Sequence, residues 1–300
     1  MKLDESLVER IRKMWGLLTV PMHASPEGLD LYRREMAQVD SAGIMVFGAT
    51  PEIIDLALDL NVPRIVGMDI HPETLEAMRR MGTRDWSRVE LYNANWLDRR
   101  PDLCEAFGGT FCDAGLLFLK CPDQWKQLFE LAHQYLKPGG RLVMKAYAPP
   151  PEAPSFEEFR RSRLAEFEAQ RPSLSVAEQI ERYRCVATEL RAAATFDIVG
   201  ANGAFDQKVL VQRCDDMAKE LLSRYPDAAF RDITEAAFLW LARTRPGVTD
   251  VITGASADMA TALLHEIGFA SEIVFLPDVP VPNGNYVIIA TKGRQTTATK

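Results

Sequence analysis

Five short apolar segments alternate with amphipathic helical segments between residues 44 and 146, and this alternation constrains the fold more than any other feature. Short connections join the segments. Strands that alternate with helices in this way pair in parallel through right-handed crossovers, which gives a doubly wound α/β sheet. The expected strands are 44–47, 64–68, 89–92, 110–112 and 142–146, and the expected helices begin at Pro51, Pro72 and Asp123.

Residues 136–144, Leu-Lys-Pro-Gly-Gly-Arg-Leu-Val-Met, combine a helix end, a turn and a strand. Pro138 cannot continue a helix because it lacks a backbone N–H. Gly139 and Gly140 tolerate the positive φ that a tight reversal requires. The run therefore predicts a direct connection from the helix that begins at Asp123 into the fifth strand.

The C-terminal part returns to sheet structure after a long helical region. Residues 256–268 predict a helix that ends at a glycine, and strands at 271–276 and 286–291 flank a Pro/Asn/Gly-rich turn, which predicts an antiparallel hairpin. Capping-box patterns at 155–158 and 175–178 predict helices in the insertion between the two sheet regions. A further helix is expected to begin at Asp232 or Thr234.

Two motifs lie on the expected sheet: Val-Phe-Gly-Ala-Thr-Pro-Glu at 46–52 with Asp69 after it, and the Lys-Pro-Gly-Gly-Arg-Leu-Val run. With the terminal hairpin, they resemble the class I S-adenosylmethionine-dependent methyltransferases over residues 25–147 and 255–292. The resemblance implies a Rossmann-like S-adenosylmethionine-binding domain at 41–147 and 251–293. Residues 1–40 would form an N-terminal helical segment, and residues 148–250 a helical insertion after the fifth strand that serves as a substrate cap or a dimer surface.

The resemblance also implies roles for single residues, each beside a structural alternative. The loop at 48–50 would hold the methionine part of the cofactor or simply precede a capped helix. Asp69 would accept the ribose hydroxyls or stabilise a helix N-terminus by roughly 0.3–1 kcal/mol. Asn95 would accept a hydrogen bond from the adenine amino group. The implied cofactor-binding residues are Gly48, Ala49, Thr50, Asp69, Ile70, Asn95, Trp96 and Asp113; of these, Trp96 could instead be core and Asp113 could cap a loop.

Methyl transfer from a sulfonium asks little covalent chemistry of a protein, so positioning can supply much of the acceleration. A base matters only for an acceptor that keeps its proton until attack. The sequence therefore fixes no catalytic residue. Candidates on the acceptor side are Tyr147, His23 and Tyr32, each with packing as its alternative role. Asp113 is a further candidate, which could instead hold the cofactor ammonium or cap the following loop.

The composition of the chain limits the kinds of substrate, membrane contact and metal site that we expect. The chain of 300 residues has a net charge of −7 and no Lys/Arg cluster, which argues against a nucleic-acid substrate. No apolar run approaches the ~18 residues of a membrane span, and no signal-peptide core is present, so we expect a cytoplasmic protein. The five cysteines form no C-x-x-C pair and the four histidines are scattered, so we expect no metal site.

The first interpretation is a methyltransferase that uses S-adenosyl-L-methionine and a small-molecule acceptor, with a homodimer as a further expectation. The alternative is a regulatory or non-methylating protein of the same fold, because the loop at 48–52 has a single glycine. A third interpretation is an NAD(P)-dependent oxidoreductase. The same loop argues against it, since a dinucleotide pyrophosphate needs the fuller G-x-G-x-x-G cradle.

Overall fold

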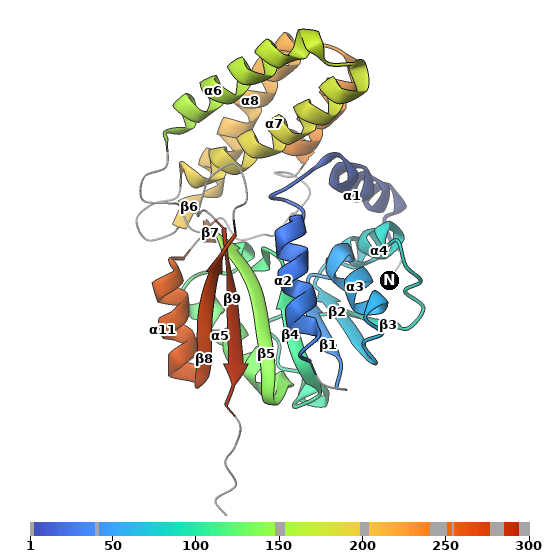
Figure 1. The fold of residues 1–300 in the computed structure, drawn as a ribbon, viewed down its shortest axis with the longest axis vertical. Coiled ribbons are helices and arrows are strands. Elements are labelled where there is room, and N and C mark those ends of the chain that lie inside the picture. The colour runs from blue at the N-terminus through green and yellow to red at the C-terminus, as the bar shows by residue number, and fades with distance from the viewer. Residues whose placement is uncertain are drawn as a thin grey trace, which may run out of the picture.

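The computed structural model describes residues 3–39, 42–147, 154–198, 204–240, 251–253, 255–276 and 285–293. A seven-stranded sheet in the order β3-β2-β1-β4-β5-β9-β8 forms its centre (Figure 1). Strands β1 to β5 are parallel, and β9 is antiparallel to both β5 and β8. This confirms the predicted parallel core and terminal hairpin. The strands are β1 Ile44–Phe47, β2 Ile65–Asp69, β3 Val89–Asn93, β4 Phe107–Cys112, β5 Leu136–Tyr147, β8 Phe269–Phe275 and β9 Asn285–Lys292.

Helices cover both faces of this sheet because the strand side chains alternate between the two faces. Ile44 and Val46 of β1 belong to the core beneath the helices α2 to α4. Met45 and Phe47 belong to the core on the opposite face, beneath α5 and α11. These helices are α2 Pro26–Met36, α3 Pro51–Asp59, α4 Pro72–Met81, α5 Asp123–Tyr135 and α11 Ala257–Ile267.

Local signals set several helix ends. The Ser25 hydroxyl accepts a hydrogen bond from the Gly28 N–H (3.1 Å), and the Ser256 hydroxyl accepts one from the Met259 N–H (3.2 Å). Helix α11 ends at Gly268, whose φ is 99°, as predicted. Thr50 precedes α3 without making a side-chain capping bond.

The connection from α5 into β5 is tighter than the sequence indicated. Leu136 already pairs with Phe107 of β4, and the register then shifts so that Arg141 pairs with Gly109. Gly139 has the predicted positive φ of 83°, but Gly140 does not. A Cβ at Gly140 would lie 2.9 Å from the Lys137 carbonyl oxygen, so space rather than φ requires a glycine there.

The insertion forms a helical bundle beyond the carboxyl ends of the strands (Figure 1). Both predicted capping boxes are present, at Ser155 and Ser175. Two short antiparallel strands, which the sequence did not indicate, accompany the helices. The elements are α6 Phe156–Gln170, α7 Val176–Phe196, β6 Ala204–Asp206, α8 Gln207–Arg224, α9 Ala228–Thr234 with a π-helical turn Glu235–Trp240, and β7 Val251–Thr253.

The predicted helix start at Asp232 or Thr234 is wrong. Asp227 precedes the first residue of α9, so both positions lie inside the helix. The Thr234 hydroxyl donates to the Phe230 carbonyl (2.8 Å) and bonds to the Tyr183 hydroxyl (2.7 Å). A buried threonine with two such partners serves tertiary packing, which the local capping pattern does not reveal.

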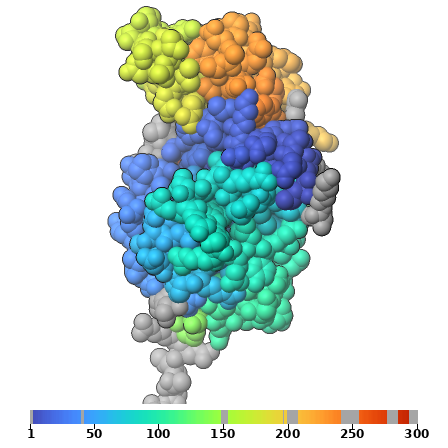
Figure 2. All heavy atoms as spheres, turned by 90° about the vertical axis from the view of Figure 1, so that its right-hand side faces the viewer, coloured from blue at the N-terminus to red at the C-terminus, as the bar shows by residue number. Residues whose placement is uncertain are grey.

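Helix α1, Glu5–Leu17, joins the bundle to the sheet region (Figure 2). Val8 and Ile11 pack into the core beside the sheet, whereas Met14 packs into the core of the bundle. Arg184 of α7 donates to the carbonyl oxygens at the end of α1 (3.2–3.3 Å). The division into residues 1–40, 41–147 with 251–293, and 148–250 remains our proposed domain organisation.

Two glycines with positive φ allow a test of how closely the chain before β1 approaches the chain before β2. Gly43 and Gly268 have φ of 87° and 99°, but only a Cβ at Gly43 would clash, at 2.4 Å from the Arg64 carbonyl oxygen. We expect Gly268→Ala to cost about 1 kcal/mol of unfolding free energy and Gly43→Ala about 2–4 kcal/mol, measured by urea denaturation. Equal losses would contradict the close approach of residues 43 and 64.

Candidate functional site

The sheet order places the carboxyl ends of four parallel strands side by side, along what we call the carboxyl edge of the sheet. In doubly wound sheets, ligands bind at the carboxyl ends of the strands where the strand order reverses, which here is between β1 and β4. Gly48 follows β1 and Asp69 ends β2. Asn95 follows β3 and Asp113 follows β4. Residues predicted from four separate segments therefore lie along one edge.

The loop after β1 makes a sharp, mostly buried turn. Gly48 and Ala49 both have positive φ, at 102° and 49°. The Gly48 N–H donates to the Met68 carbonyl oxygen (2.8 Å), which ties the loop to β2. Ala49 and Thr50 are buried, and Gly48 is half-buried. Of these three predicted residues, Gly48 is therefore the most accessible to a ligand.

The end of β2 presents an oriented carboxylate beside an open apolar surface. Asp69 Oδ1 accepts a hydrogen bond from the His71 N–H (2.8 Å). Asn93 Nδ2 donates to the carbonyl oxygens of Asp69 (3.2 Å) and Ile70 (2.7 Å), which holds β2 against the end of β3. The Ile70 side chain is large, apolar and 54% exposed. Asp69 and Ile70 thus offer a ligand a hydrogen-bond acceptor and a hydrophobic contact side by side.

Asn95 and Trp96 make structural contacts of their own. Asn95 Oδ1 accepts a hydrogen bond from the Leu97 N–H (3.0 Å), and a carboxamide oxygen can accept a second one. Trp96 Nε1 donates to the Met68 carbonyl oxygen (2.6 Å), and its ring packs edge-to-face on Phe47 at 6.1 Å between centroids. The structural role expected for Trp96 is thus present, and the ligand contacts of both residues stay predictions.

Three of the four predicted acceptor-side residues meet around a buried lysine. Asp113 Oδ1 accepts a hydrogen bond from the Tyr32 hydroxyl (3.1 Å) and lies 3.2 Å from Lys145 Nζ. Lys145 Nζ and the Tyr147 hydroxyl both donate to the Pro21 carbonyl oxygen, at 3.2 and 2.8 Å. The side chains of Lys145 and Asp113 are 1% and 2% exposed. We call Tyr32, Asp113, Lys145 and Tyr147 the buried cluster.

Burial keeps the Tyr32 hydroxyl of the buried cluster and the neighbouring Cys112 thiol protonated. Burial, followed by the charge of Asp113, raises the pKa of Tyr32 well above its usual value. Burial likewise raises the pKa of the neighbouring Cys112 thiol to about 12. Tyr32 is therefore a hydrogen-bond donor to the Asp113 carboxylate at neutral pH, and Cys112 is a neutral thiol there.

Lys145 was missed by sequence reasoning. It stands between Met144 and Ala146 in an otherwise apolar stretch of a strand. Lysines are almost never fully buried unless they are paired. A lysine inside an apolar strand run is therefore the signal that could have predicted an acidic partner nearby.

His23, the fourth candidate, lies outside the buried cluster. His23 Nδ1 is 2.5 Å from Glu52 Oε1, and Nε2 is 2.9 Å from the Trp15 carbonyl oxygen. Burial alone would lower the pKa of His23, but the hydrogen bond and charge of Glu52 outweigh it and raise that pKa. His23 thus ties the segment 18–25, which carries Pro21, to α3.

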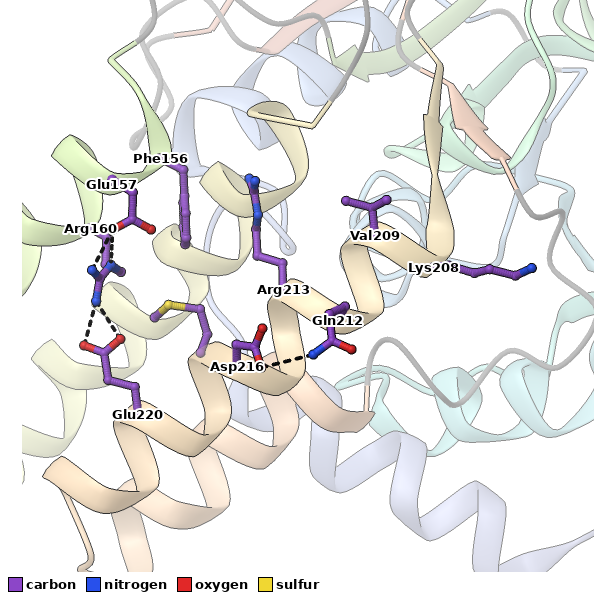
Figure 3. Close-up of a pocket in the computed structure, with 10 residues that line it drawn as sticks. Phe156, Glu157, Arg160, Lys208, Val209, Gln212, Arg213, Asp216 and Glu220 are labelled. Atoms are coloured by element: carbon purple, nitrogen blue, oxygen red, sulfur yellow. Dashed lines mark hydrogen bonds and ion pairs between the residues drawn. The ribbon is translucent and has the colours of Figure 1, made fainter.

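A groove with a volume of about 590 Å³ lies between α6 and α8 of the bundle (Figure 3). Several of its polar side chains bond to one another: Arg160 bonds to Glu157 and Glu220, and Gln212 bonds to Asp216 (Figure 3). Arg213, which also lines the groove, pairs with Asp197. Among the described residues, no group of three or more His, Cys, Asp or Glu could hold a metal ion. Within the same part of the chain, no helix is long and apolar enough to cross a membrane.

The sequence matches no protein-family model and no curated protein sequence. Solved structures do match the fold. A candidate zinc-dependent alcohol dehydrogenase from Rhodobacter sphaeroides is 13% identical, with a TM-score of 0.56 over 97% of this chain and 100% of that chain. A chain from the complex between the Haloferax volcanii Trm112 methyltransferase activator and a candidate methyltransferase is 10% identical, with a TM-score of 0.50 over 98% of this chain and 100% of that chain.

An S-adenosylmethionine-dependent methyltransferase from Mesorhizobium loti is 15% identical, with a TM-score of 0.47 over 88% of this chain and 100% of that chain. At such identities, likeness concerns the fold alone. The fold is Rossmann-like, and its C-terminal antiparallel hairpin gives it the strand plan of the class I methyltransferases.

Breaking the buried ion pair should destabilise the protein in a coupled way. Asp113→Asn or Lys145→Met alone leaves an uncompensated buried charge, so we expect each to cost about 3–5 kcal/mol of unfolding free energy. The double variant removes both charges and should cost clearly less than the sum of the two. Urea denaturation of the four proteins measures this coupling, and additive losses would contradict a direct pair.

The ion pair between His23 and Glu52 predicts a pH dependence. Because the folded-state pKa of His23 is raised above 6.5, its stabilisation is fully present below pH 6.5 and is lost as the pH rises through the folded pKa. The unfolding free energy of the wild type should therefore fall with rising pH above 6.5, and His23→Gln should remove that fall.

His133 provides a control of opposite sign. Burial, with the charge of Lys292, lowers its pKa, so its effect on stability appears only as the pH falls below 6.5. His133→Gln should keep the loss of stability above pH 6.5. If His23→Gln and the wild type have the same profile there, the pair is not formed in solution.

Proposed function

We propose that this protein is an S-adenosyl-L-methionine-dependent methyltransferase that acts on a small-molecule acceptor. The observation that carries the proposal is the antiparallel strand β9 between β5 and β8. The dinucleotide-binding version of the doubly wound sheet has six strands in the order 3-2-1-4-5-6, without such a strand. The sheet therefore favours the methyltransferase interpretation over an NAD(P)-dependent oxidoreductase. Sequence identity does not decide between them, because the dehydrogenase and methyltransferase structures are similarly distant from this chain, at 13% and 10%.

The cofactor would lie across the edge from β2 to β4. Asp69 would accept the ribose hydroxyls, and the exposed Ile70 would contact the adenine beside Asn95 and Trp96. Gly48, with Ala49 and Thr50 behind it, would border the methionine part. When bound, S-adenosyl-L-methionine supplies a methyl group already activated on a sulfonium.

Asp113 has a different part in this proposal from the one that the resemblance implies. Its carboxylate is held by Tyr32 and Lys145, and only 2% of the side chain is exposed. The residue as a whole is half-buried, so its exposed part is the main chain. We therefore place the Asp113 backbone at the cofactor and its carboxylate on the acceptor side.

The buried cluster would define the acceptor side, where positioning matters most. Tyr32 and Lys145 hold the Asp113 carboxylate in one orientation. Because it is buried and paired, the carboxylate would shape the acceptor side rather than take a proton from the acceptor. The helical bundle of residues 148–250 would cap this side, and a homodimer through the same bundle is its alternative role.

Charge and thiol chemistry support the remaining parts of the proposal. The chain is acidic overall, with a net charge of −7, which suits a small acceptor better than a nucleic acid. All five cysteines are free thiols, as is usual in the reducing cytoplasm, which we propose as the location.

A second candidate is a protein of the same fold that binds S-adenosyl-L-methionine without transferring the methyl group. The closure of the buried cluster favours it, because Lys145 is already bonded to Asp113 and to the Pro21 carbonyl, and the Tyr147 hydroxyl is bonded to the same carbonyl. Binding without any release of S-adenosylhomocysteine across a panel of small-molecule acceptors would support this candidate.

Calorimetric titration with S-adenosyl-L-methionine and S-adenosylhomocysteine tests the proposal. We expect low-micromolar affinity, near −8 kcal/mol, for at least one of them. Asp69→Ala should weaken it at least tenfold, because the ribose loses its acceptor. Failure of the wild type to bind either ligand would overturn the proposed cofactor.

Asp85→Ala is the matched control for this titration. Asp85 Oδ1 accepts a hydrogen bond from the Ser87 N–H (2.9 Å), the same local bond that Asp69 makes with His71, but on an exposed turn away from the edge. Its affinity should equal that of the wild type. An Asp69→Ala variant that also binds like the wild type would remove Asp69 from the site.

A further inference from the structure

The indole of Trp96 lies between the chain that follows β1 and the chain that follows β4, where the strand order reverses, and we call the space between them the crevice. A Cβ at Gly48, after β1, would lie 3.4 Å from Trp96 Cζ2. A Cβ at Gly115, in the loop after β4, would lie 2.8 Å from Trp96 Cη2 and 3.0 Å from Cζ3. One edge of the six-membered ring therefore spans the gap between the two loops that border the switch point.

Several contacts hold the indole there. Its Nε1 donates to the Met68 carbonyl oxygen at 2.6 Å, and the same oxygen accepts the Gly48 N–H at 2.8 Å. The ring packs edge-to-face on Phe47. A side chain at position 115 would collide with the ring, so Gly115 makes room for it. The indole is therefore a built-in part of the crevice.

The surroundings of the crevice also disfavour a phosphate group. Phosphates bind to helix N-termini through free backbone N–H groups. Here Pro51 begins α3 and has no N–H, so one of the backbone donors at this helix start is missing. Ala49 and Thr50 are buried. Asp69 and Ile70 stay accessible at the end of β2, where a nucleoside without phosphate would bind.

We infer that Trp96 is the specificity-determining residue of this site: its indole fills the crevice and selects adenosyl ligands without phosphate over nucleotides. The inference rests on the proposed function and goes beyond it, because it assigns the exclusion of phosphate to one side chain. The ligand class is a nucleoside thioether or sulfonium, and the excluded class is represented by ADP and NAD.

The test compares the affinities of S-adenosylhomocysteine and ADP for the wild type, Trp96→Ala and Trp96→Phe by calorimetry. The wild type should prefer S-adenosylhomocysteine, and Trp96→Ala should reduce the ratio of the two affinities at least tenfold. If Trp96→Ala does not fold by circular dichroism, Trp96→Phe, which keeps an aromatic ring, should still reduce the ratio. An unchanged ratio in the folded variant would overturn the inference.

Trp86→Phe is the matched control. Trp86 is also a buried tryptophan whose Nε1 donates to a partner, Asp55 Oδ1 at 2.7 Å, but it packs in the core with α3 and α4. The Trp86→Phe variant should leave the affinities for S-adenosylhomocysteine and for ADP unchanged. S-adenosylhomocysteine should also change the tryptophan fluorescence of the wild type and of Trp86→Phe, and this signal should be lost in Trp96→Phe.

The outcomes separate the inference from the proposed function. If the wild type binds neither ligand but Trp96→Ala binds ADP, the proposed cofactor is wrong, and the exclusion of a phosphate ligand by Trp96 is supported. If Trp96→Ala instead gains binding of S-adenosylhomocysteine alone, Trp96 does not select adenosyl ligands and the inference is overturned. If no folded variant and no wild-type protein binds either ligand, both are overturned.

Discussion

Parallel pairing between β1 and β4 is the constraint on which the candidate site depends. The two strands are distant in sequence, yet Met45 pairs with Thr110 and Val46 with Phe111. This register sets the loop that begins at Gly48 opposite the loop that contains Gly115, at the point where the chain reverses its winding. The crevice follows from that pairing, and the pairing of β2 with β3 brings Trp96, which follows β3, to it.

A second consequence of the sheet concerns charge. Asp113 directly follows β4, and Lys145 lies within β5, the parallel strand beside it. Their side chains therefore meet in a region from which water is excluded. An ion pair in such a place gains little net stability, but losing one partner is costly. Tyr32 and the Pro21 carbonyl complete the hydrogen bonds of this pair. The N-terminal segment is therefore part of the site as well as of the scaffold.

The elements that local chemistry determines could be predicted from the sequence. Serine caps such as Ser155 and Ser175, and the glycine end at Gly268, act within one helical turn, so a short stretch of sequence contains the whole signal. The sequence could not show that α9 begins at Ala228 rather than near Thr234. Thr234 resembles a helix cap, but its hydroxyl contacts Tyr183 of another helix, and such a tertiary contact is not encoded locally. Lys145 was missed for the same reason, since only the fold reveals its partner Asp113.

The measurement that tests the account most directly is hydrogen–deuterium exchange of the whole protein with and without S-adenosylhomocysteine. Ligand at the strand ends predicts slower exchange in residues 48–52, 68–71 and 93–97, with no change in α8, which borders the groove in the bundle. Protection confined to α6 and α8, or no protection anywhere, would contradict a cofactor site at the carboxyl edge of the sheet.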